Sequence, residues 1–98
     1  MTPAEMRALI ADVYPECLLA DGFEGALIGM VERACQPPVA CYDYGTCVEI
    51  LTAQGLSQEE AHEHLAFNVM GAYVGSHTPA FLMDWRGEAG EEDQEALE

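Results

Sequence analysis

Turn-forming residues divide this chain into short segments, and this division constrains the fold more than any other feature. The breaks fall at Pro15, Asp21-Gly22, Pro37-Pro38 and Gly55. The residue before a proline avoids the helical region, and glycine commonly follows a helix end, so each break marks the end of an element. With 98 residues in total, the chain is long enough for one small domain of short helices and strands.

The first helix has a clear start and an apolar face. Thr2 and Glu5 form a T-x-x-E capping box, with Pro3 at the first helical position. We expect this helix to end before Pro15. Its apolar residues recur at helical spacing and predict one buried face, which consists of Met6, Leu9, Ile10 and Val13.

Two further helices are predicted in the second half of the chain. Asp43 is a suitable N-cap for a helix that reaches about Ala53. A second capping box, Ser57 with Glu60, starts a helix that we expect to extend to about Val74. The second half of the chain is therefore predicted to be mainly helical up to its last apolar run.

Three short apolar runs are predicted as strands. Residues 26–33 and 38–42 should form a hairpin around the prolines, and residues 78–83 provide a third strand. The predicted order of elements is α-β-β-α-α-β. This order indicates an α+β domain over residues 1–85, in which about three helices pack on a small antiparallel three-stranded sheet.

Acidic residues dominate the charge. The chain contains 18 Asp and Glu residues, three Arg and no Lys, for a formal net charge of −15. Direct binding to nucleic acid is excluded, because it needs a basic face that displaces counterions. Docking on anionic membranes is disfavoured, and no run of about 18 apolar residues is present. Residues 86–98 combine dense acid with few apolar residues, which predicts a flexible acidic tail.

Cysteine and histidine form no metal-binding or catalytic pattern. The four cysteines include no C-x-x-C pair, and His62 and His64 lie two positions apart on different faces of a helix. We therefore predict no metal and no cofactor, and we interpret the cysteines as small apolar residues in a reducing compartment. Cys47 or Ser57 could be paired with His62 as a nucleophile, but Ser57 already has a capping role, and no enzyme activity is expected.

Four segments resemble a family of small proteins encoded by bacteriophages and bacterial mobile elements. They are GFEGALIGMVER, PVACYDYGTCVEIL, LSQEEAHEHLAFNVMGAYVG and HTPAFL, which carry patterns similar to Y-D-Y-x-x-C-x-E-I-L, F-N-V-x-G-A-Y-V-G and T-P-x-F. The chain departs from the family at Gly45-Thr46 and Ser76-His77. The resemblance implies a shared fold and a phage-type origin. It implies no activity and transfers no functional residue. We separately expect a location in the cytoplasm of a bacterial host.

The density of acid indicates mimicry of nucleic acid. Duplex DNA carries about one charge per 1.7 Å, so the net charge of −15 matches about 25 Å of duplex, close to the length of such a domain. Small acidic anti-CRISPR proteins have a similar profile. The first hypothesis is a non-catalytic inhibitor, most concretely an anti-CRISPR that mimics DNA and binds a basic nucleic-acid-binding complex of the host. The acids expected to contact this partner are Glu24, Glu32, Asp43, Glu49, Glu59, Glu60 and Glu63.

A second hypothesis gives the acid no binding role. In it, the chain is a phage accessory or structural protein that binds its partner through an apolar patch, and excess acid only keeps it in solution. Trp85, at the start of the tail, is the best candidate for an exposed aromatic anchor. Salt separates the two hypotheses, because charge-based binding weakens steeply with salt and apolar docking hardly does. Under both hypotheses we expect a monomer or a small homo-oligomer.

Overall fold

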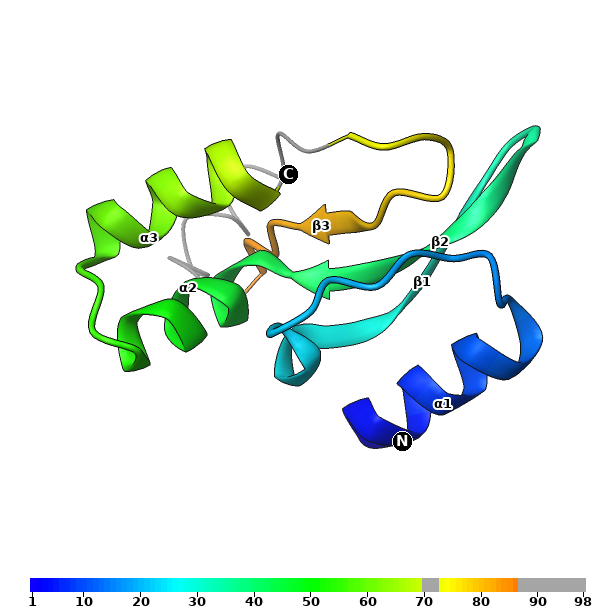
Figure 1. The fold of residues 1–98 in the computed structure, drawn as a ribbon, viewed down its shortest axis with the longest axis horizontal. Helices are drawn as coiled ribbons and strands as arrows, with labels where there is room; N and C mark the ends of the chain where they lie inside the picture. The colour runs from blue at the N-terminus through cyan, green and yellow to red at the C-terminus, as the bar shows by residue number, and fades with distance from the viewer. Residues whose placement is uncertain (70–72, 87–98) are drawn as a thin grey trace, which may run out of the picture.

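The computed structural model describes residues 1–69 and 73–86 and has helices at both ends of a three-stranded sheet (Figure 1). Two short turns, η1 of 3-10 helix and η2 of π-helix, supplement the helices and strands. Apart from these turns the element order is the predicted one, and the α+β class is confirmed. The elements are α1 (Pro3–Val13), η1 (Glu24–Ala26), β1 (Leu27–Arg33), β2 (Gln36–Asp43), α2 (Tyr44–Ala53), α3 (Gln58–His64), η2 (Leu65–Val69) and β3 (Ala80–Leu82).

The predicted helix caps are present. The Thr2 hydroxyl accepts a hydrogen bond from Glu5 N at 3.1 Å, and the Glu5 carboxylate accepts one from Thr2 N at 2.8 Å. Ser57 and Glu60 form the same reciprocal pair at the start of α3. The Asp43 carboxylate caps α2 by accepting a backbone N–H of its first turn. All three α-helix starts that the structure describes are therefore fixed by neighbouring residues.

The sheet is mixed. β1 and β2 are antiparallel, with Leu27 opposite Tyr42, whereas β2 and β3 run parallel, with Cys41 opposite Ala80. The antiparallel arrangement predicted for the whole sheet thus holds for the first pair only. Parallel neighbours need a long crossover connection, and α2, α3 and η2 lie in the connection between these two strands.

The hairpin turn lies before the prolines rather than around them. Cys35 adopts a positive φ of 60° in the turn, and Pro37 and Pro38 lie within β2. β3 pairs with β2 only from Cys41 onward, so this first part of β2 has a free edge where a proline is tolerated. The Arg33 guanidinium donates to the carbonyl of Pro37, which fixes the hairpin end.

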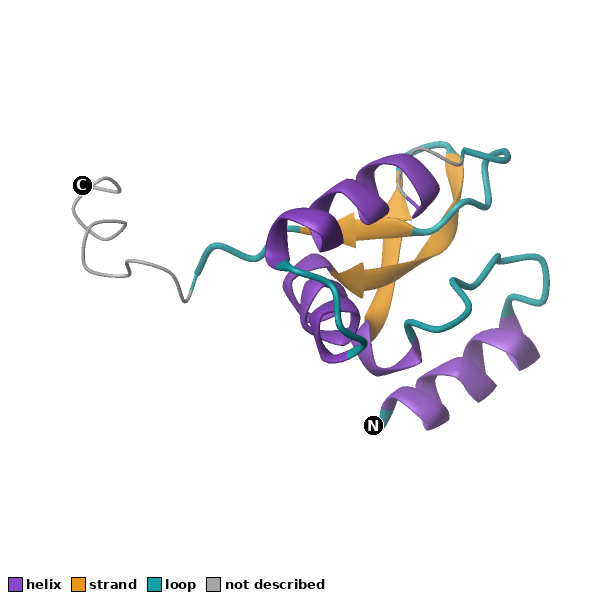
Figure 2. Cartoon of the chain, turned by 60° about the vertical axis from the view of Figure 1, so that its left-hand side comes forward, coloured by secondary structure: helices purple, strands orange, loops and turns teal. Residues whose placement is uncertain are grey.

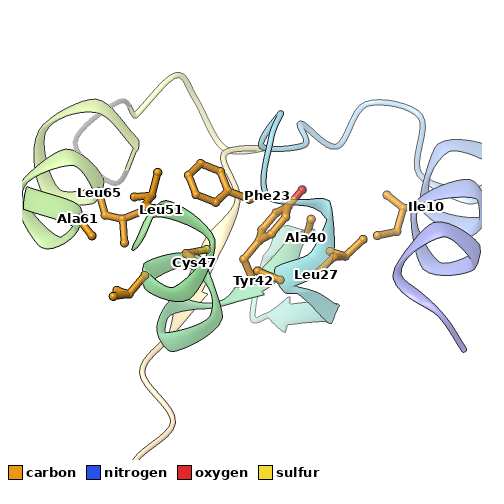
Figure 3. Packing of buried hydrophobic residues seen from close by; sticks show 11 residues of the cluster. Ile10, Phe23, Leu27, Ala40, Tyr42, Cys47, Leu51, Ala61 and Leu65 are labelled. Atoms are coloured by element: carbon orange, nitrogen blue, oxygen red, sulfur yellow. The ribbon is translucent and has the colours of Figure 1, made fainter. Parts of the chain in front are cut away.

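One apolar core joins the sheet to the helices. Tyr42 of β2 is only 1% exposed, its ring stacks on Phe81 at 5.7 Å, and its hydroxyl accepts a hydrogen bond from Ala20 N at 2.8 Å. Figure 3 shows its ring near the middle of the cluster, with α1 and α3 contributing residues from opposite ends. The cluster consists of Ile10, Phe23, Ala26, Leu27, Ala40, Tyr42, Cys47, Val48, Leu51, Ala61 and Leu65.

The helices are divided between the two ends of the sheet. α2 and α3 pack together at one end, and α1 lies at the other (Figures 1 and 2). Within the described ranges, no helix has the length and apolar character needed to cross a bilayer. This division leaves two separate surfaces available for contacts, one on α2 and α3 and one beside α1.

The third helix is shorter than predicted. The α-helix ends at His64, the π-helical turn ends at Val69, and Tyr73 and Val74 are exposed and not helical. The predicted end at Val74 was therefore wrong. The tail predicted over residues 86–98 lies almost entirely outside the described residues and stays a prediction.

Candidate functional site: an acidic surface on α2 and α3

A groove of about 740 Å³ lies between the start of α2, the start of α3 and the residues that follow β3. Three acids line it, namely Asp43, Glu49 and Asp84. Tyr44 and Trp85 add aromatic rings, and Trp85 is 69% exposed, as predicted for an aromatic anchor. The combination of carboxylates with aromatic faces suits a cationic side chain, since both attract positive charge.

Helix α3 extends the acidic character beyond the groove. Gln58 and His62, one turn apart, line the groove. Glu59 and Glu63 form the adjacent row on the helix, and both are exposed. Glu60 lies one step further round and is also exposed. Five of the seven acids predicted as contacts are thus placed on α2, α3 and the α2 cap.

Two of these five acids also fix a helix start. Asp43 Oδ2 accepts hydrogen bonds from Thr46 N at 2.9 Å and from the Thr46 hydroxyl at 2.7 Å. Glu60 Oε1 accepts one from Ser57 N at 2.9 Å. A capping carboxylate retains its charge while it accepts hydrogen bonds, so both still add to the negative surface. Their positions are fixed, whereas Glu49 is exposed and makes no side-chain hydrogen bond within the described residues.

Glu24 and Glu32 lie away from this group. The Glu24 carboxylate accepts a hydrogen bond from the Arg7 guanidinium at 2.8 Å and another from Gly22 N at 3.1 Å. Hydrogen bonds from its own backbone and from that of Gly22, together with the Arg7 charge, hold the pKa of Glu24 below its ordinary value. Glu32 is exposed on β1. Sequence spacing alone did not reveal the location of Glu24, because its contact with Arg7 spans 17 positions.

Asp84 is a groove residue that the sequence analysis missed. It accepts hydrogen bonds from Arg86 N at 3.0 Å and from two guanidinium nitrogens of Arg86 at 2.9 Å each. These bonds lower the pKa of Asp84 to about 2. The D-W-R spacing was visible in the sequence and could have indicated this local pair.

All three arginines are bonded within the chain. Arg7 contacts Glu24 at 2.8 Å, Arg33 donates to backbone carbonyls of the hairpin and of the loop before β3, and Arg86 is paired with Asp84. The chain has no Lys, so among the described side chains no Lys or Arg remains free to bind an anion. The surface is therefore suited to positively charged partners.

An aromatic pair joins the two helices at the groove. The Tyr44 hydroxyl lies 2.7 Å from His62 Nδ1, and the two rings stack with centroids 5.5 Å apart. Tyr44 is at the start of α2 and His62 is on α3, and both line the groove. The pair therefore holds the α3 acids in a defined position relative to Glu49.

Among the described residues, no hydrogen bond joins His62 to Cys47 or to Ser57, and Nδ1 of His62 lies beside the Tyr44 hydroxyl instead. Cys47 is fully buried, and burial raises the pKa of its thiol to about 11, so the thiolate needed for attack is scarce at neutral pH. The Ser57 hydroxyl accepts the backbone N–H of Glu60 as a helix cap. In the part of the chain that the structure describes, no three His, Cys, Asp or Glu side chains lie together as metal ligands would.

Comparison with known proteins identifies no relative. No family model matches the chain, and neither a curated protein nor a solved structure matches it. The resemblance to proteins of bacteriophages and mobile elements therefore stays a prediction.

Proposed function

We propose that this protein is a non-catalytic inhibitor that uses α2 and α3 to bind a basic, nucleic-acid-binding surface of a host defence complex. The supporting observation is the acidic groove, which is lined by Asp43, Glu49 and Asp84 and bordered by α3, the helix that carries Glu59 and Glu63. In its most concrete form the protein is an anti-CRISPR that acts by DNA mimicry in the cytoplasm of a bacterial host.

The charge spacing on α3 supports this proposal. Glu59, Glu60 and Glu63 span just over one helical turn, or about 6 Å of helix axis. That line of charge is comparable with duplex DNA, which carries about one charge per 1.7 Å. Like charges at this spacing destabilise an isolated helix slightly, and the Lys or Arg side chains of a partner would relieve the repulsion.

Electrostatic binding of this kind has a kinetic signature. Association is steered by the acidic field, so it should be fast at low salt and slow steeply as salt increases. If the acid only maintained solubility, binding through an apolar patch would be nearly independent of salt. The salt dependence of the association rate is therefore the quantity to measure.

The experiment uses the immobilised protein to capture complexes from a bacterial lysate at about 0.05 M NaCl. Captured complexes are tested for nucleic-acid binding, and duplex DNA is added as a competitor. Association rates are then compared between the wild type and the triple variant Glu49→Gln, Glu59→Gln, Glu63→Gln. We expect DNA to compete, and we expect the variant to associate about tenfold more slowly with a flatter salt dependence.

The control variant removes the same net charge elsewhere. Asp12→Asn, Glu16→Gln and Glu32→Gln change three exposed acids that lie outside α2 and α3. This control should associate at close to the wild-type rate. Equal slowing in both variants, or capture that duplex DNA does not reduce, would contradict binding through α2 and α3.

A further inference from the structure

Helix α1 buries only part of the apolar face that its sequence predicts. Ile10 is the one buried residue of this helix, whereas Leu9 is 49% exposed and Val13 is 51% exposed. A helix on a small domain is held chiefly by burial of its apolar face. The uncovered part of this face is therefore available to bind something other than the chain's own core.

The uncovered face forms one wall of an apolar groove. The groove has a volume of about 510 Å³ and is lined by residues of α1 and β1. Met6, Leu9 and Val13 line it from α1, and Ile28 and Met30 line it from β1. None of the side chains that line it carries a charge. Methionine side chains are flexible and adapt to different apolar partners. Met6 and Met30 therefore allow the groove to accept apolar side chains of different shapes.

Acids border this groove. On α1, helical geometry places Glu5 and Asp12 beside Leu9, at the outer edge of the apolar face. On β1, Glu32 follows the groove-lining residues and is exposed. The one basic residue of α1, Arg7, lies at the other edge of the apolar face, where Glu24 and Asp21 bind it. An occupant of the groove would therefore meet apolar side chains in the middle and negative charge at the edge.

Charge distinguishes between the candidate occupants. A second copy would bring another net charge of −15 against the acidic border. Residues 88–98 of the same chain carry six acids and would be repelled in the same way. A strand added along β1 is disfavoured, because the register of β1 is irregular between Leu27 and Gly29 and again between Val31 and Arg33.

We infer that the groove between α1 and β1 is a docking site for a basic amphipathic helix of a partner protein. The apolar stripe of such a helix fits the groove, and Lys or Arg at its borders pairs with the acids. This inference goes beyond the proposed function, because it depends on the opposite end of the molecule and on apolar contact.

The probe is a synthetic peptide of about eighteen residues that contains only Leu and Lys, with Leu at i, i+3, i+4 and i+7. A second peptide has the same composition in scrambled order and therefore lacks an apolar face. Both carry a fluorophore, and binding to the full chain is measured by fluorescence anisotropy. We expect the amphipathic peptide to bind at least about tenfold more tightly than the scrambled one and to gain helix when bound.

Two variants assign the binding to the groove without changing the net charge. Leu9→Gln with Ile28→Gln replaces one exposed residue from each wall, and Phe67→Gln replaces a 79% exposed residue on η2, outside the groove. The double variant should bind the amphipathic peptide about tenfold more weakly. Phe67→Gln should leave the affinity unchanged, and both variants should melt within about 3 °C of the wild type.

Three results would overturn the inference. In the first, the scrambled peptide binds as tightly as the amphipathic peptide, which would show that charge alone is sufficient for binding. Another is equal affinity for the wild type and the Leu9→Gln, Ile28→Gln variant. The third is a wild-type dimer in light scattering that this variant dissociates, which would show that a second copy covers the groove.

Discussion

The hydroxyl of Tyr44 lies 2.7 Å from Nδ1 of His62 and is the contact that joins the start of α2 to α3 at the acidic groove. The rings also stack, at 5.5 Å between centroids. Ala61 and Leu65 bury the inner face of α3 and its continuation, so the pair adds orientation to a helix that apolar packing already holds.

Removing this hydrogen bond should loosen α3 measurably. Tyr44→Phe keeps the ring stacking and removes the hydroxyl, so we expect a loss of about 0.5–1.5 kcal/mol in the free energy of unfolding. Urea denaturation followed by circular dichroism gives this value. Tyr73→Phe is the control, because Tyr73 is 72% exposed and should change stability by less than about 0.5 kcal/mol. Equal effects in the two variants would contradict a structural role for the Tyr44 hydroxyl.

The capping role of Asp43 can be separated from its charge. Asp43→Ala removes the acceptor for Thr46 N and should cost about 1–2 kcal/mol in unfolding free energy. Asp43→Asn retains an acceptor oxygen and should restore most of this stability while removing the charge. Chemical denaturation of both variants checks the expectation. If Asn were as damaging as Ala, the charge would matter more than the cap.

The backbone hydrogen bonds to the Glu24 carboxylate, together with the nearby Arg7 guanidinium, should make stability depend on pH. The pKa of Glu24 is lowered in the folded protein from its ordinary value of 4.5, so the folded state binds this proton less readily than the unfolded state. Its stabilising contribution is present above pH 4.5 and is lost as the pH falls through the lowered pKa. The wild type should therefore exceed Glu24→Gln in stability at neutral pH, and the difference should vanish in acid.

Urea midpoints measured from neutral to acidic pH test this expectation. Glu32→Gln is the matched control, since Glu32 has no arginine partner among the described residues. A difference between the wild type and Glu24→Gln that stays constant across the whole pH range would contradict a lowered pKa of Glu24 in the folded protein.

The four cysteines should react with alkylating reagents at different rates. Cys35 is exposed in the hairpin turn, whereas Cys47 is fully buried and burial raises its pKa to about 11. Burial also raises the pKa of Cys41. Iodoacetamide at neutral pH should therefore label Cys35 first and Cys47 only after unfolding. Peptide mass spectrometry of the folded protein provides the measurement, and rapid labelling of Cys47 would contradict the packing described here.

Local signals predicted the elements well. The pairs Thr2 with Glu5 and Ser57 with Glu60 are reciprocal capping boxes in the structure, because such boxes depend only on residues three positions apart. The three strands also appear where short apolar runs predicted them. These features needed no knowledge of tertiary contacts.

The errors arose where distant parts of the chain decide the outcome. Val74 continues the apolar pattern of α3, yet it is exposed and not helical. Leu9 and Val13 have the spacing of core residues, but α1 meets the sheet through Ile10, which leaves them half exposed. Periodicity shows which face of a helix is apolar, but not how much of that face another element covers.

The acidic surface likewise combines residues placed by local spacing with residues placed by distant contacts. The sequence predicted the row on α3 from spacing alone, since Glu59 and Glu63 are one turn apart. It did not predict that Asp84 joins the groove, because the position of this residue depends on how β3 pairs with β2. It also did not predict that Glu24 lies away from this row, because the contact of Glu24 with Arg7 joins two different elements.

The parallel pairing of β2 with β3 also sets an order of folding. Cys41 meets Ala80 about forty positions later in the chain, so this contact closes a long loop, whereas the β1–β2 hairpin and the helix caps form between near neighbours. The hairpin and helices can therefore assemble during synthesis before β3 has emerged from the ribosome. Until β3 arrives, Tyr42 lacks the Phe81 ring that stacks on it, and the edge of β2 stays open to pairing with other chains.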